Sequence, residues 1–82
     1  MDPQLVKDCI RGFLADTFRG REIADDQDIF DSGFGNSLLA MQLVEFVEGA
    51  FDIAVEGDDL VIGNFRSIRD IATLVQSKKA AA

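Results

Sequence analysis

The sequence predicts an all-α protein, a small bundle of three main helices and one short helix with a long first loop. Three stretches of the chain place apolar residues at helical spacing, and two of them begin at residues that cap helices well. The one stretch that looks extended, residues 52–56, is short. Amphipathic helices of this number bury their apolar faces most simply against one another, in a small antiparallel bundle.

The first helix is expected to run from Pro3 to about Phe18. Asp2 suits the capping position, and proline suits the first helical position. The apolar face at helical spacing consists of Leu5, Val6, Cys9, Ile10, Phe13 and Leu14. Cys9 lies in this stripe, so we expect a small buried hydrophobic residue there, with a reactive thiol as the alternative.

The helical pattern stops between residues 19 and 36, where a long loop is expected. Loops of this length are uncommon in small domains and are usually functional. Its markers are the residues Asp25, Asp26, Asp28, Asp31, Gly33 and Gly35. Three apolar residues are expected to anchor the loop to the core, namely Ile29, Phe30 and Phe34.

The second helix is expected over residues 37–51, with more apolar residues than one narrow stripe can hold. A plausible core face consists of Leu43, Phe46, Val47, Ala50 and, in one interpretation, Leu39. A different side of the helix carries Leu38, Met41, Gln42 and Glu45. An apolar excess on one helix indicates either deep burial or a docking surface.

The last third of the chain predicts a turn or short third helix over residues 58–63 and a fourth helix from about Ser67. Ser67 and Asp70 resemble a capping box. The buried face of the fourth helix is expected to contain Ile68, Ile71, Ala72, Leu74 and Val75. Residues 78–82 are expected to form a flexible, frayed tail, although Lys78 and Lys79 would suit the negative end of a helix.

Composition narrows the class of protein. The 82 residues suffice for one small domain, and the 48% hydrophobic content predicts a packed core. The net charge of −7 argues against nucleic-acid binding and favours partners with basic surfaces. With one cysteine and no histidine, the chain can form neither an internal disulfide nor a Cys/His zinc cluster. Nothing resembles a signal peptide or a membrane span, so the expectation is a cytoplasmic protein without a membrane partner.

Ser37 is the candidate functional residue, at the start of the second helix. The positive end of a helix suits a phosphate ester, although an ordinary helix cap at Asn36 or Ser37 is the simpler alternative. The chain has no histidine to activate this serine, no Gly-x-Ser-x-Gly elbow and no Gly-Lys-Ser phosphate loop. The acidic loop does not match the ligand pattern of an EF-hand calcium site, because Phe30 would occupy a ligand position. We therefore expect no catalytic residue and no metal site.

Several motifs together resemble the attachment site of acyl and peptidyl carrier proteins, over nearly the whole chain. These motifs are Asp28-Ile29-Phe30-Asp31-Ser32-Gly33-Phe34-Gly35-Asn36-Ser37-Leu38, then Leu39-Ala40-Met41-Gln42-Leu43-Val44 and Phe65-Arg66-Ser67-Ile68-Arg69-Asp70-Ile71. The resemblance implies a four-helix carrier domain over residues 1–77. It also implies that a phosphopantetheinyl transferase attaches 4′-phosphopantetheine from coenzyme A to Ser37. The thiol of that arm then carries an acyl group as a thioester.

The resemblance also implies a partner-recognition surface along the second helix. Its residues would be Asn36, Leu38, Leu39, Met41, Gln42 and Glu45. The family usually has aspartate at the position of Asn36, and often acids at those of Leu39 and Gln42. This nearly uncharged helix start favours partners other than generic fatty-acid enzymes.

Two cargoes are consistent with the sequence. Three motifs resemble freestanding carriers of dedicated polyketide extender units, such as hydroxymalonyl or methoxymalonyl groups built from a glyceryl thioester, namely Phe34-Gly35-Asn36-Ser37-Leu38, Met41-Gln42-Leu43-Val44 and Phe46-Val47-Glu48. The run Leu38-Leu39-Ala40-Met41 is more similar to peptidyl carriers of nonribosomal peptide synthesis. The expected partners are thus an acyl-loading enzyme and polyketide or nonribosomal peptide synthase enzymes, acting on a monomer. The remaining alternative is an unmodified protein-interaction module.

Overall fold

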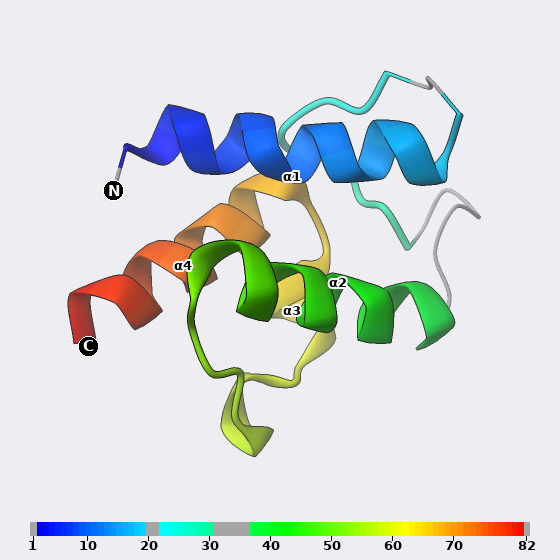
Figure 1. Ribbon diagram of the computed structural model, residues 1–82. Coiled ribbons are helices and arrows are strands. Elements are labelled where there is room, and N and C mark those ends of the chain that lie inside the picture. Colours follow the sequence, from blue (N-terminus) through cyan, green and yellow to red (C-terminus); the bar gives the residue numbers. More distant parts are fainter. Residues whose placement is uncertain (1, 20–21, 31–36, 82) are drawn as a thin grey trace.

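The computed structural model describes residues 2–19, 22–30 and 37–81, with only the backbone described for Ser37 and Ala81. It confirms the all-α bundle. In chain order the helices are α1 (Pro3–Thr17), α2 (Ser37–Phe51), a 3₁₀ turn η1 (Gly57–Asp59), α3 (Ile62–Phe65) and α4 (Ile68–Ala81). α1 and α2 run in opposite directions, and α4 packs against α1, with the short α3 between α2 and α4 (Figure 1).

The helix starts follow from local capping, as expected. The Asp2 carboxylate accepts a hydrogen bond from the Gln4 amide at 2.9 Å, and Pro3 is the first helical residue. At the start of α4, the Ser67 hydroxyl accepts from the Asp70 amide at 3.1 Å and donates to the Asp70 carboxylate at 2.9 Å. Ser67 is buried, so these two bonds also satisfy a hydroxyl that water does not reach.

One hydrophobic core joins the three long helices, and its residues recur every four positions. α1 contributes Val6, Ile10 and Leu14, and α2 contributes Leu39, Leu43, Val47 and Phe51. The core is completed by Ile23, Ile29, Phe65, Ile68, Ile71, Ala72, Leu74 and Val75. Burial of these side chains is the main stabilising term of the bundle.

Several sequence expectations about the core were wrong. Cys9 is exposed, and so are Leu5 and Ala50. The core of α1 centres on Ile10, and the preceding residue points about 100° around the helix from it. The apolar stripe read from the sequence was therefore wider than the face that packs.

The end of α4 also differs from expectation. The helix continues through Lys78 and Lys79 to Ala81, where we expected a frayed tail. Both lysines lie in the last turn, at the negative end of the helix, where cations are favourable. Lys78 is further held by an ion pair with Asp59 at 2.6 Å.

Candidate functional site

The start of α2 is the centre of the candidate site. Ser37 is its first residue, as predicted, and the first turn contains no acidic residue. The first amides of a helix have no partner within the helix and carry a partial positive charge, so the position suits an anionic ester such as a phosphodiester. The Ser37 side chain and all of Asn36 lie outside the described residues.

Four of the six residues predicted for the recognition surface are exposed on one side of α2, which we call its outer face. Leu38 and Met41 are 64% and 65% exposed, and Gln42 and Glu45 are exposed beside them. Large apolar side chains in water next to an acid are typical of a surface that binds another protein. This outer face, formed by these four residues, begins one residue after Ser37.

Leu39 was wrongly included in that surface. It is only 4% exposed and belongs to the hydrophobic core, one helical turn before Leu43. The Leu39 side chain is therefore turned into the core, whereas that of its neighbour Leu38 is exposed on the outer face. The core interpretation of this residue is the one that the structure confirms.

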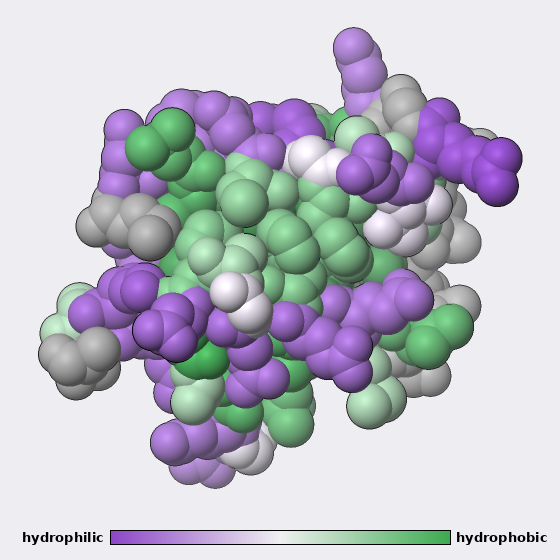
Figure 2. Space-filling model, in the orientation of Figure 1, coloured by the Kyte–Doolittle hydropathy of each residue, from purple (hydrophilic) through white to green (hydrophobic). Residues whose placement is uncertain are grey.

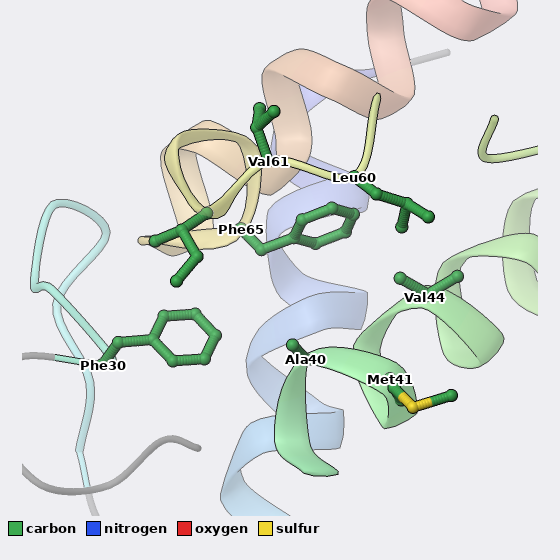
Figure 3. Close-up of a pocket in the computed structure, with 8 residues that line it drawn as sticks. Phe30, Ala40, Met41, Val44, Leu60, Val61 and Phe65 are labelled. Atoms are coloured by element: carbon green, nitrogen blue, oxygen red, sulfur yellow. The ribbon is translucent and has the colours of Figure 1, made fainter. Parts of the chain in front are cut away.

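An apolar pocket of about 140 Å³ lies beside the outer face. Its lining residues come from the first loop, α2 and the segment around α3, and they are Phe30, Ala40, Met41, Val44, Leu60, Val61, Ile62 and Phe65. Figure 3 shows the ring of Phe65 beside Leu60 on the side of α2 that carries Ala40 and Val44, with the ring of Phe30 extending toward the pocket from the first loop. Apolar cavities near 150 Å³ can bind a molecule as large as benzene.

The pocket wall formed by Leu60, Val61 and Ile62, which ends at the first residue of α3, was not predicted from the sequence. Leu60, Val61 and Ile62 are each more than half exposed, which is unusual for three consecutive large apolar residues. The signal was available, because this run lies between acidic residues and Gly63 in a segment too short to bury it. We had taken the run only as an indication of a turn or short helix.

An open groove lies between α2 and α1, and the outer-face residues Gln42 and Glu45 form part of its lining. Its lining is Phe13, Thr17, Gln42, Glu45 and Phe46. The rings of Phe13 and Phe46 stack with centroids 4.5 Å apart, and both are half-buried. Figure 2 shows hydrophobic residues across the middle of this face, bordered by hydrophilic ones. The outer face of α2 is thus flanked by apolar surface on both sides.

Charge is distributed unevenly along the chain. Residues 37–65 contain no lysine or arginine but carry six acids, namely Glu45, Glu48, Asp52, Glu56, Asp58 and Asp59. A surface of this sign attracts basic partners, and its effect on the association rate falls as salt is added. The end of α2 and the segment after it therefore carry most of the net charge of −7.

The acids of the first loop have a different role. Asp25 pairs with Lys7 at 3.4 Å and also with Arg11, both on α1. Asp26 and Asp28 pair with Arg69 and Arg66 at 3.5 and 3.6 Å. Two backbone bonds add to this connection, Ile29 amide to Arg66 carbonyl at 2.7 Å and Arg69 amide to Asp25 carbonyl at 2.9 Å. These acids join the loop to α1 and to the residues around the start of α4.

No group of three or more Cys, Asp or Glu side chains within residues 2–19, 22–30 and 37–81 is arranged to hold a metal ion. Within those same ranges, no helix has both the length and the apolar character that crossing a membrane requires.

Comparison with known proteins agrees with the geometry. The family model described as "Phosphopantetheine attachment site" matches residues 4–75, nearly the whole bundle. The chain is also similar to the D-alanyl carrier protein of Lactococcus lactis subsp. lactis (strain IL1403), with 35% identity over 54 residues, 66% of this chain and 68% of the relative. Members of this family are non-catalytic carriers whose cofactor is 4′-phosphopantetheine. The chain therefore belongs to the phosphopantetheine-binding carrier protein family.

Proposed function

We propose that Ser37 is the residue that receives 4′-phosphopantetheine and that the chain then carries an acyl unit as a thioester on that arm. The observation that carries this proposal is the position of Ser37 as first residue of α2, inside the segment that matches the family. The phosphodiester would lie beside the unpaired amides of the first turn, and no acid of that turn would repel it. The chain has no histidine to act as a base, and we expect the transferase to supply the base that removes the serine proton.

The hydroxyl groups of the described residues support this choice by their surroundings, and Ser32, outside those residues, is tested by the variant below. Ser67 is buried and bonded to Asp70. The hydroxyls of Thr17 and Thr73 donate to backbone carbonyls one helical turn earlier, at 3.0 and 2.9 Å. Ser77 lies outside the matched residues 4–75. Each of these four groups is thus either engaged in a hydrogen bond or outside the segment that matches the family.

A serine-to-alanine pair tests the attachment site. Ser37→Ala is expected to abolish the gain of a phosphopantetheinyl group from coenzyme A and a promiscuous transferase. Ser32→Ala, a matched change in the same segment, is expected to load like wild type. Loading of Ser37→Ala, which would give it the same intact mass as loaded Ser32→Ala, would disprove the assignment.

The cargo that we favour is a polyketide extender or another glyceryl-derived unit. Support comes from the motif Phe34-Gly35-Asn36-Ser37-Leu38 and its resemblance to carriers of such units. Polar units of this kind gain little from the apolar pocket, so we expect them to stay largely exposed. The partners would be a phosphopantetheinyl transferase, an acyl-loading enzyme and polyketide synthase enzymes, each binding a monomeric carrier through the outer face of α2.

An amino acid is the second candidate cargo, within nonribosomal peptide synthesis. The specific observation in its favour is the similarity to a protein named as a D-alanyl carrier. The two cargoes are separated by offering the holo chain to two loading systems, an adenylating ligase with amino acids and a glyceryl-loading enzyme. Acylation by the glyceryl system alone supports the extender-unit role, and acylation by the ligase alone supports the aminoacyl role.

A further inference from the structure

Asp59 is the centre of a small polar network next to the apolar pocket. Its carboxylate accepts from the Lys78 ammonium at 2.6 Å and from the Glu56 amide at 3.0 Å. Its backbone carbonyl accepts from the Asn64 side-chain amide and from the Val61 amide, both at 2.9 Å. One residue thus connects η1, the start of α3 and the last turn of α4.

The ion pair within this network is partly shielded from solvent. The side chains of Asp59 and Lys78 are each 22% exposed, less than those of the pairs in the first loop. The hydrogen bond from Lys78 lowers the pKa of Asp59, and the same bond raises the pKa of Lys78. Ion pairs with reduced exposure are screened less by salt than fully exposed pairs.

The segment that follows Asp59 has little buried surface to fix its position. Leu60, Val61 and Ile62 follow Asp59 directly and form one wall of the pocket. Each is more than half exposed, so burial in the core contributes little to fixing their positions. The hydrogen bonds and the ion pair of Asp59 therefore help to position this wall, beside the bonds from the Leu60 amide to the Gly57 carbonyl and from the Asn64 amide to the Val61 carbonyl.

We propose that the Lys78–Asp59 ion pair is a latch that positions the Leu60–Ile62 wall, so that the last turn of α4 controls whether the pocket can hold the apolar part of a load. Its effect on loads rests on the proposed function, because the arm on Ser37 would bring the load to the pocket. Lys78 and Asp59 are positioning residues, since neither lines the pocket.

The latch itself is tested on the unloaded chain by amide hydrogen exchange. Lys78→Met removes the ammonium and keeps much of the apolar stem. Lys79→Met is the matched control, because Lys79 lies in the same turn and has no ion pair among the described residues. Exchange at the Leu60 and Val61 amides, which donate to Gly57 and Asp59, is expected to rise about two- to fivefold in Lys78→Met, the range for an ion pair of this exposure.

The effect on a load is tested with a hexanoyl group attached through the arm. Wild type and Lys79→Met are expected to show hexanoyl-dependent shifts of the Leu60–Phe65 amide resonances. Lys78→Met is expected to weaken the equilibrium for pocket occupancy by the same factor of about two to five, so each shift is smaller than in Lys79→Met. Circular dichroism of each variant checks that the bundle remains folded.

The possible results separate the two proposals. Equal exchange in Lys78→Met and Lys79→Met overturns the latch, whether or not the chain can be loaded. Equal hexanoyl-dependent shifts in all three proteins, or none in a wild type whose mass shows the load, overturn its control of the pocket. Absence of loading in an active transferase reaction counts against Ser37, and the exchange result still decides the latch.

Discussion

Leu43 and Leu38 allow the same substitution to be made on the buried and exposed sides of α2. Leu43 is 0% exposed, at the centre of the helix and within the core, whereas Leu38 is 64% exposed. Replacing a buried leucine by alanine removes its transfer free energy and leaves a cavity, which together cost about 2–5 kcal/mol. Replacing an exposed leucine changes stability by about 0.5 kcal/mol or less.

These costs are large against the stability of a domain of this size. At about 0.05–0.15 kcal/mol per residue, the whole bundle should be stable by only about 4–12 kcal/mol. In domains of this length each 1 kcal/mol lowers the melting temperature by about 4–8 °C. Leu43→Ala should therefore melt at least about 10 °C below wild type, and Leu38→Ala within about 4 °C of it.

The assay is thermal and urea unfolding followed by the helical circular dichroism signal. The slope of the free energy against urea concentration should be unchanged in both variants, since that slope reflects the surface exposed on unfolding. Equal destabilisation by Leu43→Ala and Leu38→Ala would refute the assignment of the two sides of α2. A loss below about 1 kcal/mol for Leu43→Ala would refute its burial in a packed core.

Three further predictions concern single contacts. Ser67→Ala should lower the free energy of unfolding by about 1 kcal/mol through loss of the helix cap, measured by urea titration. Asp52 has a φ of 55° directly after α2, so Asp52→Gly should raise the melting temperature, by relieving backbone strain and removing an acid from the negative helix end; a lower melting temperature would contradict this. Lys78 holds the pKa of Asp59 below its ordinary 3.8, and Asp59 holds the pKa of Lys78 above its ordinary 10.5. Glu56 contributes to both shifts, in each case less than the hydrogen bond between Lys78 and Asp59. The stability advantage of wild type over Lys78→Met should accordingly be full between about pH 4 and pH 10, and vanish as pH falls below that range or rises above it; an advantage that persists at both extremes would contradict the ion pair.

The features that could be predicted from the sequence are those set by local chemistry. Residues 37–51 form the expected helix, Pro3 begins α1, and Ser67 caps α4. Each follows from the periodicity of apolar residues or from a side chain that satisfies nearby amides. The position of Ser37 at a helix start follows from the same pattern.

The features that could not be predicted depend on which side chains meet in the folded chain. Cys9 and Leu5 fit a helical stripe, but only packing decides how wide the buried face is. Leu39 fitted both the core and the surface, because a helix this rich in apolar residues offers more than one face. Lys78 was assigned to a tail because its partner, Asp59, lies far away in the sequence.

The most direct test of the central claim is to locate the modification on the wild-type chain. The protein would be incubated with coenzyme A and a promiscuous phosphopantetheinyl transferase, beside a carrier known to be modified. Intact mass would then be measured, followed by fragmentation of the modified protein. We predict a gain of one phosphopantetheinyl group, located at Ser37. A group located at any other residue, or no gain while the control carrier is modified, would contradict the proposal that Ser37 holds the arm.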